Sequence, residues 1–185
     1  LKDFYDSSYL NDPQSLGNNL IINNKVNLIE SDVKFEIALI FAGRSLNENY
    51  DINSTQQVRE QIYKLKKISS GLKVFDLGNL KTGQNLKETL FALEEVCSLL
   101  FSLKINIVVI GGTQMLNLAV FNAYKEFENN INLVTVDSKI DISDKDNFDS
   151  LRYLDNLIYK EAAHIYNIAN IGNWELDAET LNGFW

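Results

Sequence analysis

Several residue types that build functional sites are scarce in this chain of 185 residues, which contains one cysteine, one histidine, one proline and one methionine. A single cysteine excludes a disulfide within the chain. With one histidine and one cysteine, few of the usual zinc sites and cysteine–histidine nucleophiles can be assembled. The sequence also lacks a recognisable signal peptide and an apolar run of roughly 18 residues, so we expect a cytoplasmic protein.

Positive charge is also in short supply. The chain has 17 Lys and Arg residues against 25 Asp and Glu residues, which gives a formal net charge of −8. Long-range repulsion then argues against nucleic acid and against an anionic membrane surface as the main partner. Hydrophobic residues make up 45% of the chain, which is enough for one packed domain at this length.

Strand-like and helix-like segments alternate from residue 34 onward. Apolar, β-branched runs typical of strands occur at 34–42, 73–80, 105–112, 131–137 and 163–172. Helical patterns lie between them at 53–68, 85–104, 113–129 and 147–162. This alternation predicts a three-layer α/β/α fold with a mainly parallel sheet. Residues 1–34 are rich in Asn, Asp and Ser, and we expect them to form an irregular N-terminal arm.

Two helical segments have a predicted buried face. In 53–68, helical spacing predicts a buried face formed by Val58, Ile62, Leu65 and Ile68. The opposite, solvent face is formed by Arg59, Glu60, Lys64 and Lys66. In 85–104, Cys97 lies beside a stripe of apolar residues. No cation or helix N-terminus is evident near Cys97, so we interpret it as a small buried hydrophobic residue, with a reactive thiol as the alternative.

The candidate sites follow from the sheet, because parallel α/β sheets bind ligands beyond the carboxyl ends of their strands. Four segments fall there: 43–49, 76–78, 111–114 and 137–141. In the first, Arg44 and Asn47 are candidates for binding an anionic ligand, and a solvated loop is the alternative. In the third, Gly111 and Gly112 are a weak phosphate-loop candidate, because a third glycine and a Walker lysine are missing.

The last of these segments carries carboxylates. The stretch "VTVDSKIDI" places Asp137, Lys139 and Asp141 at alternate positions where a strand ends. If the chain stays extended, the three side chains point to the same side. Two carboxylates that converge there either hold a divalent cation or need an internal counter-charge.

These motifs resemble those of the ureohydrolases, the family of arginases, agmatinases and formimidoylglutamases, and most closely the formimidoylglutamase-like proteins of Bacteroidetes-type bacteria. "GGTQ" is similar to the family motif Gly-Gly-Asp-His, and "DSKID" to Asp-Ala-His-x-Asp. Three further segments are similar to family segments: "STQQVREQIYKL", "KVFDLGNL" and "YNIANIGNWELDAETL". The resemblance covers residues 35–182 and implies an arginase-like α/β domain over 35–185, incomplete and equivalent to the N-terminal two thirds of the family domain.

The resemblance also implies a site for a pair of manganese ions, in altered form. Asp137 and Asp141 stand at retained ligand positions, whereas Gln114 and Lys139 stand where the family has histidine ligands. The third family motif, Ser-x-Asp-x-Asp-x-x-Asp-Pro, does not occur in the 185 residues. Our hypothesis is that the Lys139 ammonium takes the place of a metal ion between the two aspartates, while Gln114 adds a hydrogen bond. The alternative is that Lys139 extends to solvent.

Three functions remain open at this point. We expect a degenerate, non-catalytic family member that binds a small molecule or a protein and needs no cofactor. The first alternative is a Mn²⁺-dependent hydrolase of linear amidine C–N bonds in formiminoglutamate- or guanidino-type substrates. The second is an unrelated nucleotide-binding or regulatory α/β module.

The sequence also predicts structural roles for the only histidine and the two tryptophans. His164 is interpreted as a structural or surface residue, with proton transfer as the alternative. Trp174 and Trp185 are expected to cover an open face, either as a contact in a homo-oligomer or as part of the core.

Overall fold

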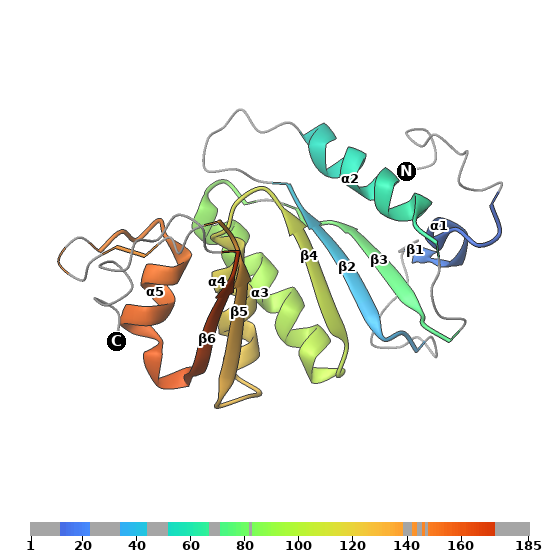
Figure 1. Ribbon diagram of the computed structural model, residues 1–185. Helices are drawn as coiled ribbons and strands as arrows, with labels where there is room; N and C mark the ends of the chain where they lie inside the picture. Colours follow the sequence, from blue (N-terminus) through green and yellow to red (C-terminus); the bar gives the residue numbers. More distant parts are fainter. Residues whose placement is uncertain are drawn as a thin grey trace.

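The fold is a parallel α/β arrangement in a computed structural model that describes residues 12–22, 34–43, 52–66, 71–81, 83–138, 142–143, 146 and 148–172. Its strands form two sheets (Figure 1). One sheet has four strands in the order β1-β3-β2-β4, and the other pairs β5 with β6. Every strand pair is parallel. The predicted α/β class with parallel pairing is therefore confirmed.

The regular elements follow the predicted alternation along the chain. The strands are β1 (Ile21–Ile22), β2 (Ile37–Ala42), β3 (Val74–Asn79), β4 (Asn106–Gly111), β5 (Ile131–Val136) and β6 (Ile165–Ile171). The helices are α1 (Leu16–Asn19), α2 (Ile52–Lys64), α3 (Leu86–Ser102), α4 (Leu116–Lys125), α5 (Tyr153–Lys160) and the 3₁₀ helix η4 (Ala162–His164). All five predicted strands and all four predicted helices are present, each somewhat shorter than its sequence pattern.

The N-terminal region differs from the expected irregular arm. The Ser15 side chain accepts a hydrogen bond from the backbone N–H of Asn18 and so caps α1. The two residues of β1 then pair in parallel with Phe75 and Asp76 of β3. Leu16 and Leu20 pack against the buried residues of the sheet. The expectation is therefore wrong for residues 16–22, because contacts with the sheet order a segment that has no helical or strand period of its own.

Helices cover both faces of the four-stranded sheet, and β2 lies between them. One face of β2 packs with residues of α3 and α4. The other face packs with Ile62 of α2 and with Leu16 and Leu20. From Ala38 onward every residue of β2 is buried, as its nearly continuous apolar sequence predicts.

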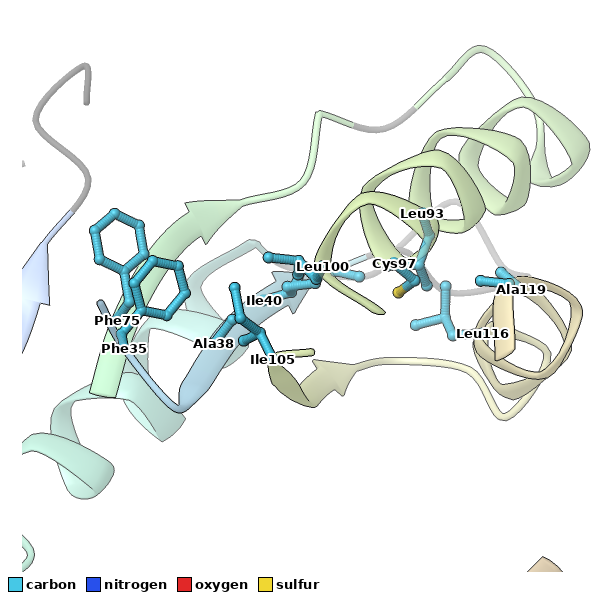
Figure 2. Packing of buried hydrophobic residues seen from close by; sticks show 12 residues of the cluster. Phe35, Ala38, Ile40, Phe75, Leu93, Cys97, Leu100, Ile105, Leu116 and Ala119 are labelled. Carbon is cyan, nitrogen blue, oxygen red and sulfur yellow. The ribbon is translucent and has the colours of Figure 1, made fainter. Parts of the chain in front are cut away.

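The core on the α3 side combines small and branched side chains with two phenylalanines (Figure 2). Leu93, Cys97 and Leu100 project from one face of α3 towards α4 and the sheet. Leu116 and Ala119 of α4 meet them. At the far end of this core the rings of Phe35 and Phe75 stack, with centroids 4.7 Å apart. The burial of Cys97 confirms its interpretation as a small buried hydrophobic residue.

The two-stranded sheet has its own core. Buried residues of α4, β5 and α5 form it: Met115, Phe121, Ile131, Tyr153, Leu154 and Leu157. Helix α4 thus contributes to both large cores and joins the two sheets on one side. Among the helices that the structure describes, none combines the length and apolar character needed to cross a membrane.

The buried face of α2 is only partly the predicted one, because Ile62 packs against the sheet as expected but most of the buried residues differ. Thr55, Arg59 and Tyr63, spaced four residues apart, are buried. Val58 and Leu65 are instead exposed, at 43% and 58%, and Ile68 lies outside the described residues. The prediction placed Arg59 in solvent because arginine is usually exposed, but here Asp76 of β3 supplies a buried partner 3.0 Å away.

Candidate functional site

Gln114 and Asp137 meet at the carboxyl ends of the strands. Gln114 follows β4 by three residues, and Asp137 directly follows β5. The Nε2 atom of Gln114 donates a hydrogen bond of 3.1 Å to Oδ2 of Asp137. Two of the four segments selected from the sequence are therefore in direct contact.

The turn that carries Gln114 depends on a close approach between β4 and α4. A Cβ atom on Gly111 would lie 2.1 Å from Cδ1 of Leu116 and 3.0 Å from the carbonyl oxygen of Ala42. Only glycine leaves enough room for Leu116 to be buried there. Thr113 then supports the turn, because its Oγ1 accepts a hydrogen bond from the N–H of Met115 just before α4 begins. The glycine and the threonine thus place Gln114 beside Asp137.

The other predicted site residues lie outside the part of the chain that the structure describes. Asp141 and Lys139 follow Asp137, and the description of the chain resumes at Ile142 and Ser143. Arg44 and Asn47 lie in the segment 44–51, which the structure does not describe. Trp174 and Trp185 lie in a further such segment, 173–185. Their assigned roles stay predictions from the sequence.

The segment after the acidic motif is anchored by a buried carboxylate that the sequence analysis did not single out. Asp155 in the first turn of α5 is fully buried. Its Oδ1 accepts a hydrogen bond of 2.8 Å from the N–H of Ser143, and its Oδ2 one of 2.9 Å from the N–H of Asp149. Tyr159 also donates a hydrogen bond to the carbonyl oxygen of Ser143. Helix α5 thereby fixes both ends of segment 143–149.

The described residues do not fit a pair of manganese ions. Within the described ranges, no group of three or more His, Cys, Asp and Glu side chains is placed to hold a metal ion. Of the two carboxylates that the described residues supply in the candidate segments, that of Asp76 is held by Arg59 and Tyr63. The amide of Gln114 directs its N–H towards the other, that of Asp137. A pair of Mn²⁺ ions needs several oxygen or nitrogen ligands in addition.

Asp76, in a third candidate segment, belongs to a buried network that fixes α2 on the sheet. Its Oδ2 accepts hydrogen bonds from Arg59 and Tyr63, and its Oδ1 accepts one from the N–H of Gly78. Arg59 also donates to Oδ1 of Asn79 at 2.7 Å and lies over the ring of Phe41. Through Arg59 and Tyr63, the carboxylate of Asp76 ties α2 to the sheet.

His164 and Cys97 lie away from the contact between Gln114 and Asp137. His164 ends η4 and precedes β6, so it lies at the amino end of the strands, opposite Gln114. Cys97 is buried in α3. The pKa of its thiol is raised to about 12, mainly by burial and to a smaller extent by the negative charge of the nearby Glu94.

The sequence contained usable signals for the residues that were missed. Arg59 lies midway between Thr55 and Tyr63 at a spacing of four residues, which puts all three on one helix face. Asp76 is two residues after Val74 in a buried strand, so its side chain lies on the same face of the sheet as that of Val74. Asp155 has a weaker signal, because an acidic residue in the first turn of a helix is ordinary.

Similarity to known proteins agrees with this architecture. The model of the arginase family matches residues 41–172. Formimidoylglutamase from Bacillus subtilis superposes with a TM-score of 0.65 at 9% identity, over 89% of this chain and 55% of that protein. Proclavaminate amidino hydrolase from Streptomyces clavuligerus gives 0.63 at 15% identity, over 92% and 60%. A search of curated proteins by sequence found no match.

A third relative by structure is the arginase-like protein of T. brucei, crystallised as two mutants. The quadruple mutant introduces aspartates and a histidine and gives a TM-score of 0.58 at 15% identity, over 83% of this chain and 55% of that one. The triple mutant, bound with Mn²⁺, gives 0.58 at 13% identity, over 96% and 61%.

The sheet, its helices and these superpositions define an α/β protein with the arginase fold. Since the family model covers most of its length, the chain belongs to the arginase family of ureohydrolases. It spans just over half of the length of the structures that it matches. The alternative of an unrelated nucleotide-binding module finds no support in these matches.

Proposed function

We propose that this chain is a degenerate member of the arginase family that binds a small molecule or a protein without Mn²⁺-dependent hydrolysis. The hydrogen bond between Gln114 and Asp137 carries the proposal. By resemblance, Gln114 stands where the family has a histidine ligand. The amide NH₂ group has no lone pair to offer a metal ion, and it occupies an acceptor site on Oδ2 of the carboxylate that would have to bind the metal.

The charge at the strand end supports the same proposal. The sequence places Lys139 between Asp137 and Asp141 at alternate positions. A lysine ammonium carries a positive charge with three donors, which neutralises carboxylates but binds no metal. In this proposal Lys139 balances the two aspartates, so that the pocket attracts no divalent cation. The alternative is that Lys139 extends to solvent and leaves them to cap the following turn.

The T. brucei arginase-like protein offers a parallel in another chain of the same fold. Three substitutions of its quadruple mutant introduce Asp, His and Asp at alternate positions, and the histidine replaces an arginine. Its triple mutant, which includes this histidine, is bound with Mn²⁺. Asp137, Lys139 and Asp141 have the same alternate spacing, also with a basic residue in the middle. The parallel supports a cationic side chain at this position within an arginase fold.

The second candidate is a metal-dependent hydrolase of linear amidine C–N bonds in formiminoglutamate- or guanidino-type substrates. Membership of the arginase family favours it, as do the names of the formimidoylglutamase and the amidino hydrolase whose folds it shares. In this alternative, residues outside the described part of the chain complete the metal site around Asp137 and Asp141.

A manganese titration distinguishes the candidates. Calorimetry of the unsubstituted chain should show no Mn²⁺ binding, whereas the double variant Gln114→His, Lys139→His should bind Mn²⁺, because both substitutions supply neutral imidazole ligands. Adding Asp137→Asn to the double variant is the matched control and should abolish the binding. Tight binding of one or more Mn²⁺ ions by the unsubstituted chain would contradict the proposal.

An activity assay completes the test. The complete translation product of the gene is assayed for release of formamide or urea, with and without Mn²⁺. The proposal expects no turnover in either case. Turnover that depends on Mn²⁺ and is lost in Asp137→Ala would establish the hydrolase instead.

A further inference from the structure

We draw no further inference here: the strongest candidate, the hollow between the C-terminal ends of α3 and α4 that Phe101, Tyr124 and Phe127 line, opens beside β4, the edge strand of the four-stranded sheet, and nothing in the described part of the chain shows what covers it.

Discussion

Arg59 of α2 and Asp76 of β3 form an ion pair with 3.0 Å between Nε and Oδ2, and their side chains are only 1% and 2% exposed. Both charges are taken out of water, and Tyr63, Gly78 and Asn79 satisfy most of the remaining donors and acceptors. The pair therefore fixes how α2 lies on the sheet, close to the carboxyl end of β3.

Removing one partner of this pair should be strongly destabilising. Arg59→Met keeps much of the side-chain volume but leaves the carboxylate of Asp76 buried without its cation. We expect a loss of about 3–5 kcal/mol in the free energy of unfolding, measured by urea denaturation. Lys66→Met removes only an exposed ion pair with Asp12 and should shift the midpoint only slightly, because exposed ion pairs contribute little to stability. The double variant Arg59→Met, Asp76→Leu should recover part of the loss, and no recovery would mean that the buried charge is not the cause.

Gly111→Ala should disturb the turn that positions Gln114. The new methyl group would meet the buried Leu116 side chain and the carbonyl of Ala42. Overpacking of this kind costs about 1–3 kcal/mol. Gly71→Ala is the matched control, because a Cβ atom there meets no described atom within 4 Å; its effect should stay within about 0.5 kcal/mol. Thermal or urea unfolding measures both, and equal effects of the two substitutions would contradict the close approach of β4 and α4.

The buried thiol should make stability depend on pH in the alkaline range. In the folded protein the pKa of Cys97 is raised from 9.0 to about 12. Above pH 9 the unfolded chain loses this proton while the folded protein keeps it, so folding stability falls with rising pH up to about pH 12. The difference in unfolding free energy between the parent and Cys97→Ala should shrink by up to about 1.4 kcal/mol per pH unit over this window.

The control for this effect lies below the window. Between pH 6 and 8, below the 9.0 of the free thiol, both proteins should show the same pH dependence. In the native parent the thiol should also resist alkylation at pH 8, as expected for a buried cysteine. A parent and variant with parallel curves through pH 11 would show that the Cys97 thiol does not titrate differently in the two states.

The parts of the fold that were predicted from the sequence are those with a local periodic signal. The near-continuous apolar run of β2 indicated burial on both faces, and the apolar stripe of α3 placed Cys97 in the core. The rule that ligands bind at the carboxyl ends of parallel strands also selected the segments of Gln114 and Asp137, which the structure brings into contact.

The parts that were missed depend on partners distant in sequence. From the sequence alone, Arg59 is expected to be exposed to solvent. It is buried because Asp76, 17 positions later, faces it across the interface between helix and sheet. Asp155 accepts hydrogen bonds from the backbone N–H groups of Ser143 and Asp149, and no side-chain pattern in the sequence indicates such bonds. The gap between β4 and β5 is likewise a matter of which strands pair, and hydrophobic patterns identify strands without identifying their neighbours.

The separation of the two sheets also has a mechanical consequence. Main-chain hydrogen bonds between strands continue from β1 to β4 and begin again at β5, so the unit of β5, α5 and β6 is attached to the rest mainly through side-chain packing on α4. This unit can open with a lower free energy than the four-stranded body. Asp137 belongs to this unit and Gln114 to the four-stranded body, so their hydrogen bond breaks when the two come apart, as does the ion pair between Lys125 of α4 and Glu161.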